Sequence, residues 1–108
     1  MASISFEGRP TQVLHTYQVW RIGSDENDKS LDYYSPDKSL HKLHASLTRG
    51  EKALFLENES RTGCMAVNGI RFGGPMIITY RDAIDGIVKL KFGNIEGYLR
   101  VSGSITGY

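Results

Sequence analysis

Two histidines and a cysteine are the residues of this chain best suited to metal binding or catalysis. His41 and His44 are three positions apart, and Cys64, the only cysteine, follows twenty residues after His44. Imidazole nitrogens and thiolates bind zinc, and a histidine beside a cysteine can activate it as a nucleophile. A zinc site needs three or four ligands at defined spacing, however, and no CxxC pattern or activating context accompanies Cys64. We therefore expect no metal, no cofactor and no enzymatic activity. An enzyme would require these three side chains to converge at one cleft.

The composition describes one ordinary globular domain without a strong electric field. The chain has 108 residues, 40% apolar and 23% charged, with 13 basic against 12 acidic residues and a formal net charge of +1. Such a balance gives no bulk attraction to nucleic acid or to an anionic membrane, so we expect neither as a direct partner. No apolar run approaches the roughly 20 residues that span a bilayer. One cysteine excludes a disulfide framework within the chain and is consistent with a reducing, intracellular compartment.

The pattern of apolar residues predicts an all-β protein with no substantial helix. Apolar runs are short and 12 glycines interrupt the chain at close intervals, as in a β-sandwich or barrel. The strongest local signal is Asn68-Gly69 between two apolar runs, which is typical of a type I′ hairpin turn. About ten short strands are expected, within the segments 2–6, 11–23, 30–34, 44–50, 51–58, 64–67, 70–72, 76–80, 87–93 and 97–103.

Three short motifs, in order, resemble the forkhead-associated (FHA) domain family. They are "RIGS" at the end of an early strand, then "LHKLHASL", then "LFLENESRTGCMAVNG". Members of that family show Gly-Arg, then Ser-Arg-x-His-Ala, then Ser-x-Asn-Gly-Thr leading to Val-Asn-Gly. The resemblance covers about residues 17–101. It implies an FHA-like sandwich of two antiparallel or mixed sheets, with about ten to eleven strands, that is not an enzyme and binds phosphothreonine peptides with loops at one end.

The residues that match the family are those of the loop scaffold. His44 matches the histidine of the second motif. The resemblance implies that His44 has a structural role and braces the loops. The matching scaffold positions are Gly23, His44, Gly63, Asn68 and Gly69.

The positions that contact phosphate in the family are mostly changed. Ser24 stands where the first arginine belongs, His41 replaces the serine, and Lys42 replaces the second arginine, which keeps the charge but loses the planar guanidinium. Thr62 replaces the asparagine of the third motif, with Arg61 beside it. Since one charged hydrogen bond is worth about 1.5–3 kcal/mol, we expect weak or no conventional phosphothreonine binding.

The retained scaffold and altered pocket predict a protein–protein interaction module that acts through another surface. This interaction module is the leading hypothesis; self-association as a homodimer is one form that it could take, and the apolar segment with Met76, Ile77, Ile78 and Tyr80 is the candidate surface. The alternative for this segment is that both faces of its strand are buried. The alternative function is phosphothreonine-peptide binding through a rearranged pocket.

That rearranged pocket would use Lys42, His41 and Arg61. The resemblance to the family also implies a nuclear signalling protein that acts in the DNA-damage response or chromosome maintenance. We also expect residues 1–108 to form a single FHA-like domain in the N-terminal part of a longer protein.

Overall fold

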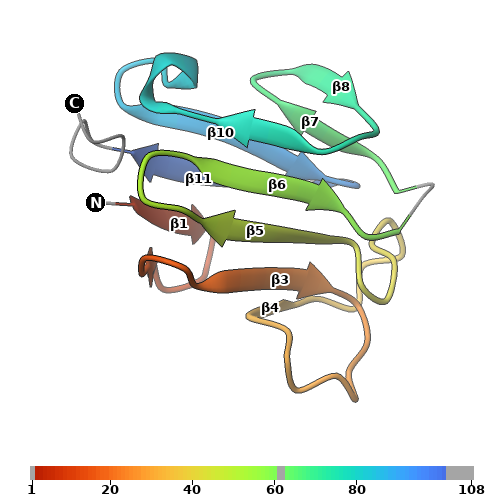
Figure 1. Cartoon of the computed structure of the whole chain (residues 1–108). Helices are drawn as coiled ribbons and strands as arrows, with labels where there is room; N and C mark the ends of the chain where they lie inside the picture. The colour runs from red at the N-terminus through yellow and green to blue at the C-terminus, as the bar shows by residue number, and fades with distance from the viewer. Residues whose placement is uncertain (1, 61–62, 102–108) are drawn as a thin grey trace.

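The computed structural model describes residues 2–60 and 63–101, and within them the chain forms a sandwich of two β-sheets (Figure 1). The six-stranded sheet has the order β2-β1-β11-β10-β7-β8 and the five-stranded sheet the order β4-β3-β5-β6-β9. The all-β, FHA-like sandwich predicted from the sequence is confirmed, with eleven strands. The strands are β1 (Ala2–Phe6), β2 (Gln12–Leu14), β3 (Val19–Gly23), β4 (Tyr33–Tyr34), β5 (Ala45–Arg49), β6 (Leu54–Asn58), β7 (Met65–Val67), β8 (Ile70–Phe72), β9 (Met76–Ile78), β10 (Ile87–Phe92) and β11 (Ile95–Val101).

The core lies between the two sheets because alternate side chains of each strand point inward. In β10, Val88, Leu90 and Phe92 are buried while Lys89 and Lys91 are exposed, as the sequence alternation predicts. Aromatic rings fill the centre of the sandwich. The indole of Trp20 is fully buried, lies 5.7 Å from the Phe6 ring and 6.0 Å from the Phe92 ring, and donates its N–H to Gln12 Oε1. The Trp20 polar atom is therefore satisfied inside the core.

The segment 11–23 is two strands, not the single strand expected from its composition. The chain turns between β2 and β3, where Tyr17 has a φ of 67° and its N–H donates to the carbonyl oxygen of Arg49. Gln18 N–H donates back to His15 O, which closes the turn. A positive φ is unusual for tyrosine, so propensity alone could not reveal this interruption.

The predicted strand at 76–80 ends earlier than expected. Beyond β9, Thr79 caps a short 3₁₀ turn, η1 (Tyr80–Asp82), by accepting a hydrogen bond from Arg81 N while its own N–H donates to the Asp82 carboxylate. This reciprocal pattern is a capping box. The sequence pattern does not predict it, because the β-branched apolar residues before Thr79 favour a continuous strand. In the described parts of the chain, no helix is long and apolar enough to cross a membrane.

The Asn68-Gly69 hairpin prediction is confirmed. Asn68 and Gly69 have φ values of 50° and 84°, and they join β7 to β8 in antiparallel register. One pairing makes the five-stranded sheet mixed, because β4 runs parallel to β3 whereas its other strands pair in antiparallel fashion. The β3–β4 crossover carries the chain from the end of β3 into the loop region described next.

Candidate functional site

Loops from both sheets meet at the end of the sandwich opposite the start of β1 (Figure 1). They are the connections β3–β4, β4–β5, β6–β7 and β10–β11, joined by backbone and side-chain hydrogen bonds. Most of the residues singled out by the family resemblance lie here. Arg61 and Thr62, two of the predicted pocket positions, lie outside the described residues.

The β3–β4 and β4–β5 loops are packed directly against each other at Gly23. A Cβ atom on Gly23 would overlap the carbonyl oxygen of Lys42, so only glycine fits at this position. The next residue, Ser24, donates its N–H to the carbonyl oxygens of His41 and Lys42 at 3.0 and 3.2 Å and its hydroxyl to Leu40 O at 3.0 Å. Both donors of Ser24 are therefore engaged within the loops.

His44 is fully buried and ties the loop before β5 to the start of β7. Its Nδ1 accepts the N–H of His41 at 3.1 Å, and its Nε2 donates to the carbonyl oxygen of Cys64 at 2.9 Å. These partners fix the neutral tautomer with the proton on Nε2. Burial lowers the pKa of His44, the Cys64 carbonyl opposes that shift, and proximity to His41 adds to it. Because both nitrogens of the neutral His44 imidazole are hydrogen-bonded within the protein, the side chain holds the two loops together; we call it the His44 brace.

The β6–β7 loop is held around Gly63. The Ser60 hydroxyl accepts the Gly63 N–H at 2.8 Å and donates to Asn58 Oδ1 at 2.7 Å, and Asn58 Nδ2 donates to Gly63 O at 3.1 Å. A Cβ at Gly63 would overlap Ser60 Oγ and press on the His44 ring. Gly63 is thus in contact with the His44 brace.

The β10–β11 turn is anchored to the β4–β5 loop through one serine. Ser39 Oγ donates to Asp37 Oδ1 at 2.6 Å and accepts the N–H of Asn94 at 2.8 Å. The Ser39 hydroxyl and N–H together hold the pKa of Asp37 below its ordinary value. Gly93 N–H donates to the Cys64 carbonyl, which therefore accepts from two different loops. The loop end of the sandwich is consequently one hydrogen-bonded unit.

Two predicted scaffold residues, Asn68 and Gly69, belong to the β7–β8 turn and not to this loop cluster, although Gly69 lines the same depression as His41. Asn68 Nδ2 donates to Asp82 O at 2.6 Å, and Asn68 Oδ1 accepts the N–H of Lys89 at 3.0 Å. Asn68 therefore links the turn to β10 and to η1.

His41, Cys64 and His44 come close without forming a catalytic pair. His41 and Cys64 line one open depression of about 630 Å³, and the His41 and His44 ring centroids are 5.5 Å apart. His44, however, bonds the backbone carbonyl of Cys64, while the Cys64 thiol accepts a hydrogen bond from Arg71 Nη2 at 2.9 Å. Within residues 2–60 and 63–101, no group of three or more His, Cys, Asp or Glu side chains could hold a metal ion.

The depression contains charged residues that the sequence analysis did not select. Arg71 from β8 and Lys91 from β10 line it together with Asn94 and Glu96 from the β10–β11 hairpin. In the sequence, Lys91 has only the pattern of a charged residue on the outward face of a strand. The sequence carries no signal that brings β8 beside it, because that proximity depends on the pairing of β7 with both β8 and β10.

Only part of the candidate self-association segment is exposed to solvent. Ile78 is fully buried and Met76 packs against the core, while Ile77 is 61% exposed and Tyr80 39% exposed. The alternative in which both faces of the strand are buried is therefore wrong for Ile77. Phe55 of β6, which is 40% exposed, is the register partner of Ile77 and extends this surface.

Comparison with solved structures identifies the class of this fold. The FHA domain of CT664 from Chlamydia trachomatis superposes with a TM-score of 0.74 at 15% identity, covering 94% of this chain and 97% of that one. The S. pombe Nbs1–Ctp1 complex gives 0.73 at 18% identity, over 94% of this chain and 36% of that one. Mycobacterium tuberculosis Rv1747 FHA-1 gives 0.67 at 13% identity, over 94% and 95%. The sandwich is that of the FHA domain.

The family model for the Mutator 2 fork head associated domain matches residues 3–101. The chain belongs to this family, and is thus a protein–protein interaction module with an FHA fold. A search of curated proteins found no match.

Proposed function

We propose that this domain binds protein partners without a conventional phosphothreonine cup and self-associates through the outer surface at β9. The observation that carries the first part is the engagement of Ser24. At the position of the family's phosphate-binding arginine stands a short hydroxyl side chain whose donors are used by Leu40, His41 and Lys42. A phosphate dianion needs several preorganised charged donors, and this position supplies none.

The remaining pocket positions support the same conclusion. His41 and Lys42 are both exposed at the rim, but the backbone N–H of His41 is donated to His44, and an ammonium group cannot form the bidentate contact of a guanidinium. Loss of two or three charged hydrogen bonds moves a micromolar site towards millimolar affinity, at about 1.4 kcal/mol for each factor of ten.

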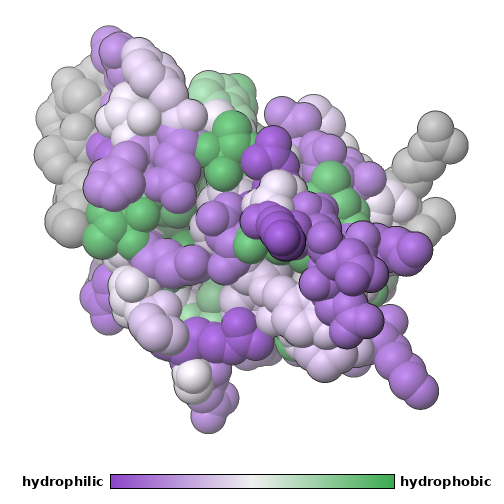
Figure 2. All heavy atoms as spheres, turned by 90° about the horizontal axis from the view of Figure 1, so that it is seen from below, coloured by the Kyte–Doolittle hydropathy of each residue, from purple (hydrophilic) through white to green (hydrophobic). Residues whose placement is uncertain are grey.

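Self-association is supported by an exposed apolar pair at one edge of the five-stranded sheet, with Ile77 on the edge strand β9 and Phe55 on its neighbour β6. β9 pairs only with β6 in the five-stranded sheet, and Phe55 and Ile77 lie side by side in register on the outer face. A two-fold dimer through this surface would cover both residues in each copy. By contrast, the molecule seen from its β4 side is predominantly hydrophilic, with only scattered apolar areas (Figure 2).

Analytical ultracentrifugation of the purified domain and of Ile77→Asp tests this proposal. We expect the parent domain to dimerise with a micromolar dissociation constant, because the small apolar area must offset the entropy lost on association. Ile77→Asp should raise that constant at least tenfold. Ile70→Asp is the matched control, since Ile70 is 73% exposed on the other sheet, and it should change nothing. A monomer at several hundred micromolar would refute self-association.

Phosphothreonine binding through a rearranged pocket is the second candidate function. What favours it is the depression beside His41, which Arg71 and Lys91 line with positive charge. Titration with a phosphothreonine peptide library tests it. Binding that disappears on dephosphorylation and on Lys42→Ala or Arg61→Ala would favour this candidate, whereas binding that is indifferent to the phosphate would exclude it.

We also propose that the domain is the N-terminal part of a longer nuclear protein acting in the DNA-damage response or chromosome maintenance. Support comes from the frequent occurrence of FHA domains in such proteins. Imaging of the tagged full-length protein before and after irradiation tests its nuclear location and its role in the DNA-damage response. Purely cytoplasmic signal, or unchanged nuclear distribution and normal repair after deletion of the domain, would contradict them.

A further inference from the structure

Four side chains form a row across the outer face of the six-stranded sheet. Arg71 of β8 is paired in register with Ala66 of β7, Ala66 with Lys91 of β10, and Lys91 with Glu96 of β11. Because partners in register lie on the same face of a sheet, the small methyl group of Ala66 lies between two long cationic side chains. An anionic group placed over Ala66 would be within reach of both Arg71 and Lys91.

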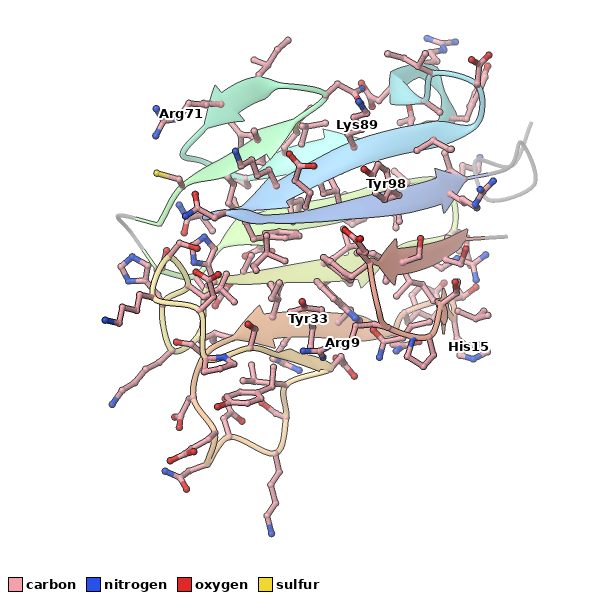
Figure 3. All side chains as sticks on the ribbon, turned by 180° about the vertical axis from the view of Figure 1, so that it is seen from behind. Arg9, His15, Tyr33, Arg71, Lys89 and Tyr98 are labelled. Atoms are coloured by element: carbon pink, nitrogen blue, oxygen red, sulfur yellow. The ribbon has the colours of Figure 1, made fainter. Side chains whose placement is uncertain are left out.

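This row opens into a groove that continues along the sheet. The depression at Arg71 shares Ala66, Gly69, Lys91 and Glu96 with a second one of about 220 Å³. The second shares Lys89 and Tyr98 with a third of about 380 Å³. Figure 3 shows Arg71, Lys89 and Tyr98 spread over this one face. The groove therefore runs from the loop end towards η1.

The two ends of the groove differ in chemistry. At the loop end lie Arg71, Lys91 and the rim residue His41. At the other end Tyr98 is 37% exposed and Ile84 is 68% exposed, and Ile87 also belongs to the lining.

The cations of the groove are available to a partner. Neither Lys89 nor Lys91 has a carboxylate within ion-pair distance in the part of the chain that the structure describes, and Arg71 has only the Cys64 thiol as a hydrogen-bond partner. The pairing of β7 with β8 and with β10 fixes the backbone positions of Arg71 and Lys91 before any partner binds.

We propose that this groove binds an extended, unphosphorylated acidic peptide. An Asp or Glu of the peptide lies over Ala66 between Arg71 and Lys91, and an apolar side chain lies against Ile84 and Tyr98. The two sites are separated by the span from Lys91 to Ile87, so the acidic and apolar residues are about four positions apart in an extended chain.

A peptide fits this surface better than a nucleic acid does. Glu96 lies beside Lys91 in the cationic part of the groove and Asp85 lies at the apolar end, so a chain of evenly spaced phosphates would meet a carboxylate in both parts. A peptide concentrates its negative charge at one position. The groove lies on the opposite sheet from Phe55 and Ile77, and it does not depend on the proposed self-association.

Two-dimensional NMR of the ¹⁵N-labelled domain tests the proposal with defined probes. The first probe is the peptide Ser-Gly-Glu-Glu-Ser-Gly-Ile-Ile-Gly-Ser. We expect saturable shifts at Ala66, Lys89, Lys91 and Tyr98, with a dissociation constant below about 1 mM for a small, partly charged contact. The same peptide with Gln for both Glu residues should bind at least fivefold more weakly.

Variants separate groove binding from general charge attraction. Arg71→Gln with Lys91→Gln should weaken binding of the Glu peptide at least tenfold. Lys29→Gln, an equally exposed cation in the β3–β4 loop, should leave binding unchanged, and so should Ile77→Asp. Shifts confined to Ser24 and Lys42, equal binding of the Gln peptide, or tighter groove binding by a thymidine dodecamer would each overturn the proposal.

Discussion

The imidazole of His44 lies 2.9 Å from the backbone carbonyl oxygen of Cys64 and so joins two loops that are distant in the sequence. The same carbonyl accepts the N–H of Gly93, and the other imidazole nitrogen accepts the N–H of His41. Three loop segments, at residues 41–44, at Cys64 and at Gly93, are thus held together by one buried side chain and one carbonyl. The stability of the loop end should therefore depend on His44 more than on any neighbouring polar residue.

Replacement His44→Ala should lower the free energy of unfolding by about 2–4 kcal/mol, because it leaves a cavity, removes the acceptor of the His41 N–H and takes one of two donors from the Cys64 carbonyl. Urea denaturation followed by tryptophan fluorescence measures this loss. His41→Ala removes an exposed ring nearby and should cost less than about 0.5 kcal/mol. Equal losses in the two variants would contradict a bracing role specific to His44.

Stability should fall as the pH drops below about 6.5, because the folded state disfavours protonation of His44. Its pKa is lowered in the fold, so below that pH the unfolded chain binds a proton that the native state resists. The stabilisation is complete above pH 6.5 and is lost between that value and the lowered native pKa. Urea midpoints measured at pH 7.5 and 5.5 test this. In His44→Gln the decline over this interval should be smaller, and a parallel decline would assign it to other groups.

Replacement Gly23→Ala should destabilise the domain by about 2 kcal/mol or more, since the new methyl group would overlap the Lys42 carbonyl oxygen. The β3–β4 and β4–β5 loops would have to separate. Gly74→Ala is the matched control, because open space surrounds Gly74, and its effect should stay within about 0.5 kcal/mol. Thermal unfolding of the two variants measures the difference. A Gly23→Ala variant as stable as the parent domain would show that the two loops are not tightly packed.

Replacement Asn68→Ala should cost about 1–3 kcal/mol, because it removes the hydrogen bonds to Asp82 and Lys89 and places alanine at a positive φ. The loss should be accompanied by faster amide exchange in η1 and at Lys89. Asn27→Ala, in the exposed β3–β4 loop, serves as the control. Fast exchange confined to the β4–β5 loop would instead connect Asn68 to the binding loops.

Self-association and peptide binding should respond differently to the salt concentration. Self-association through Phe55 and Ile77 is apolar and should change less than twofold between 50 and 300 mM NaCl. Binding of the Glu peptide relies on Arg71 and Lys91 at the surface and should weaken severalfold over the same range. Ultracentrifugation and NMR titration at both salt concentrations measure these effects, and the reverse pattern would contradict both assignments.

The fold was predictable from the sequence because its signals are local. Alternation in 87–92 and the Asn68-Gly69 dipeptide depend on neighbours along the chain, and both predictions are confirmed. The division of 11–23 was not predictable, because the positive φ of Tyr17 depends on a hydrogen bond to Arg49 from a different strand.

The candidate site was only partly predictable for the same reason. The family motifs located Gly23, His44 and Gly63, whose contacts lie within the loops that the motifs define. Arg71 and Lys91 belong to no motif. They become neighbours only when β7 pairs on both sides, which is a property of sheet topology.

The opposite placement of the β9 surface and the cationic groove has a consequence for valency. A dimer formed at Ile77 would leave the groove of each copy uncovered and would present two of them on one particle. A partner with two acidic segments on a linker of suitable length would then bind as a bivalent ligand, and its second contact would benefit from a high effective concentration. Weak affinity at a single groove would suffice for stable recruitment, and dissociation of the dimer would release the partner.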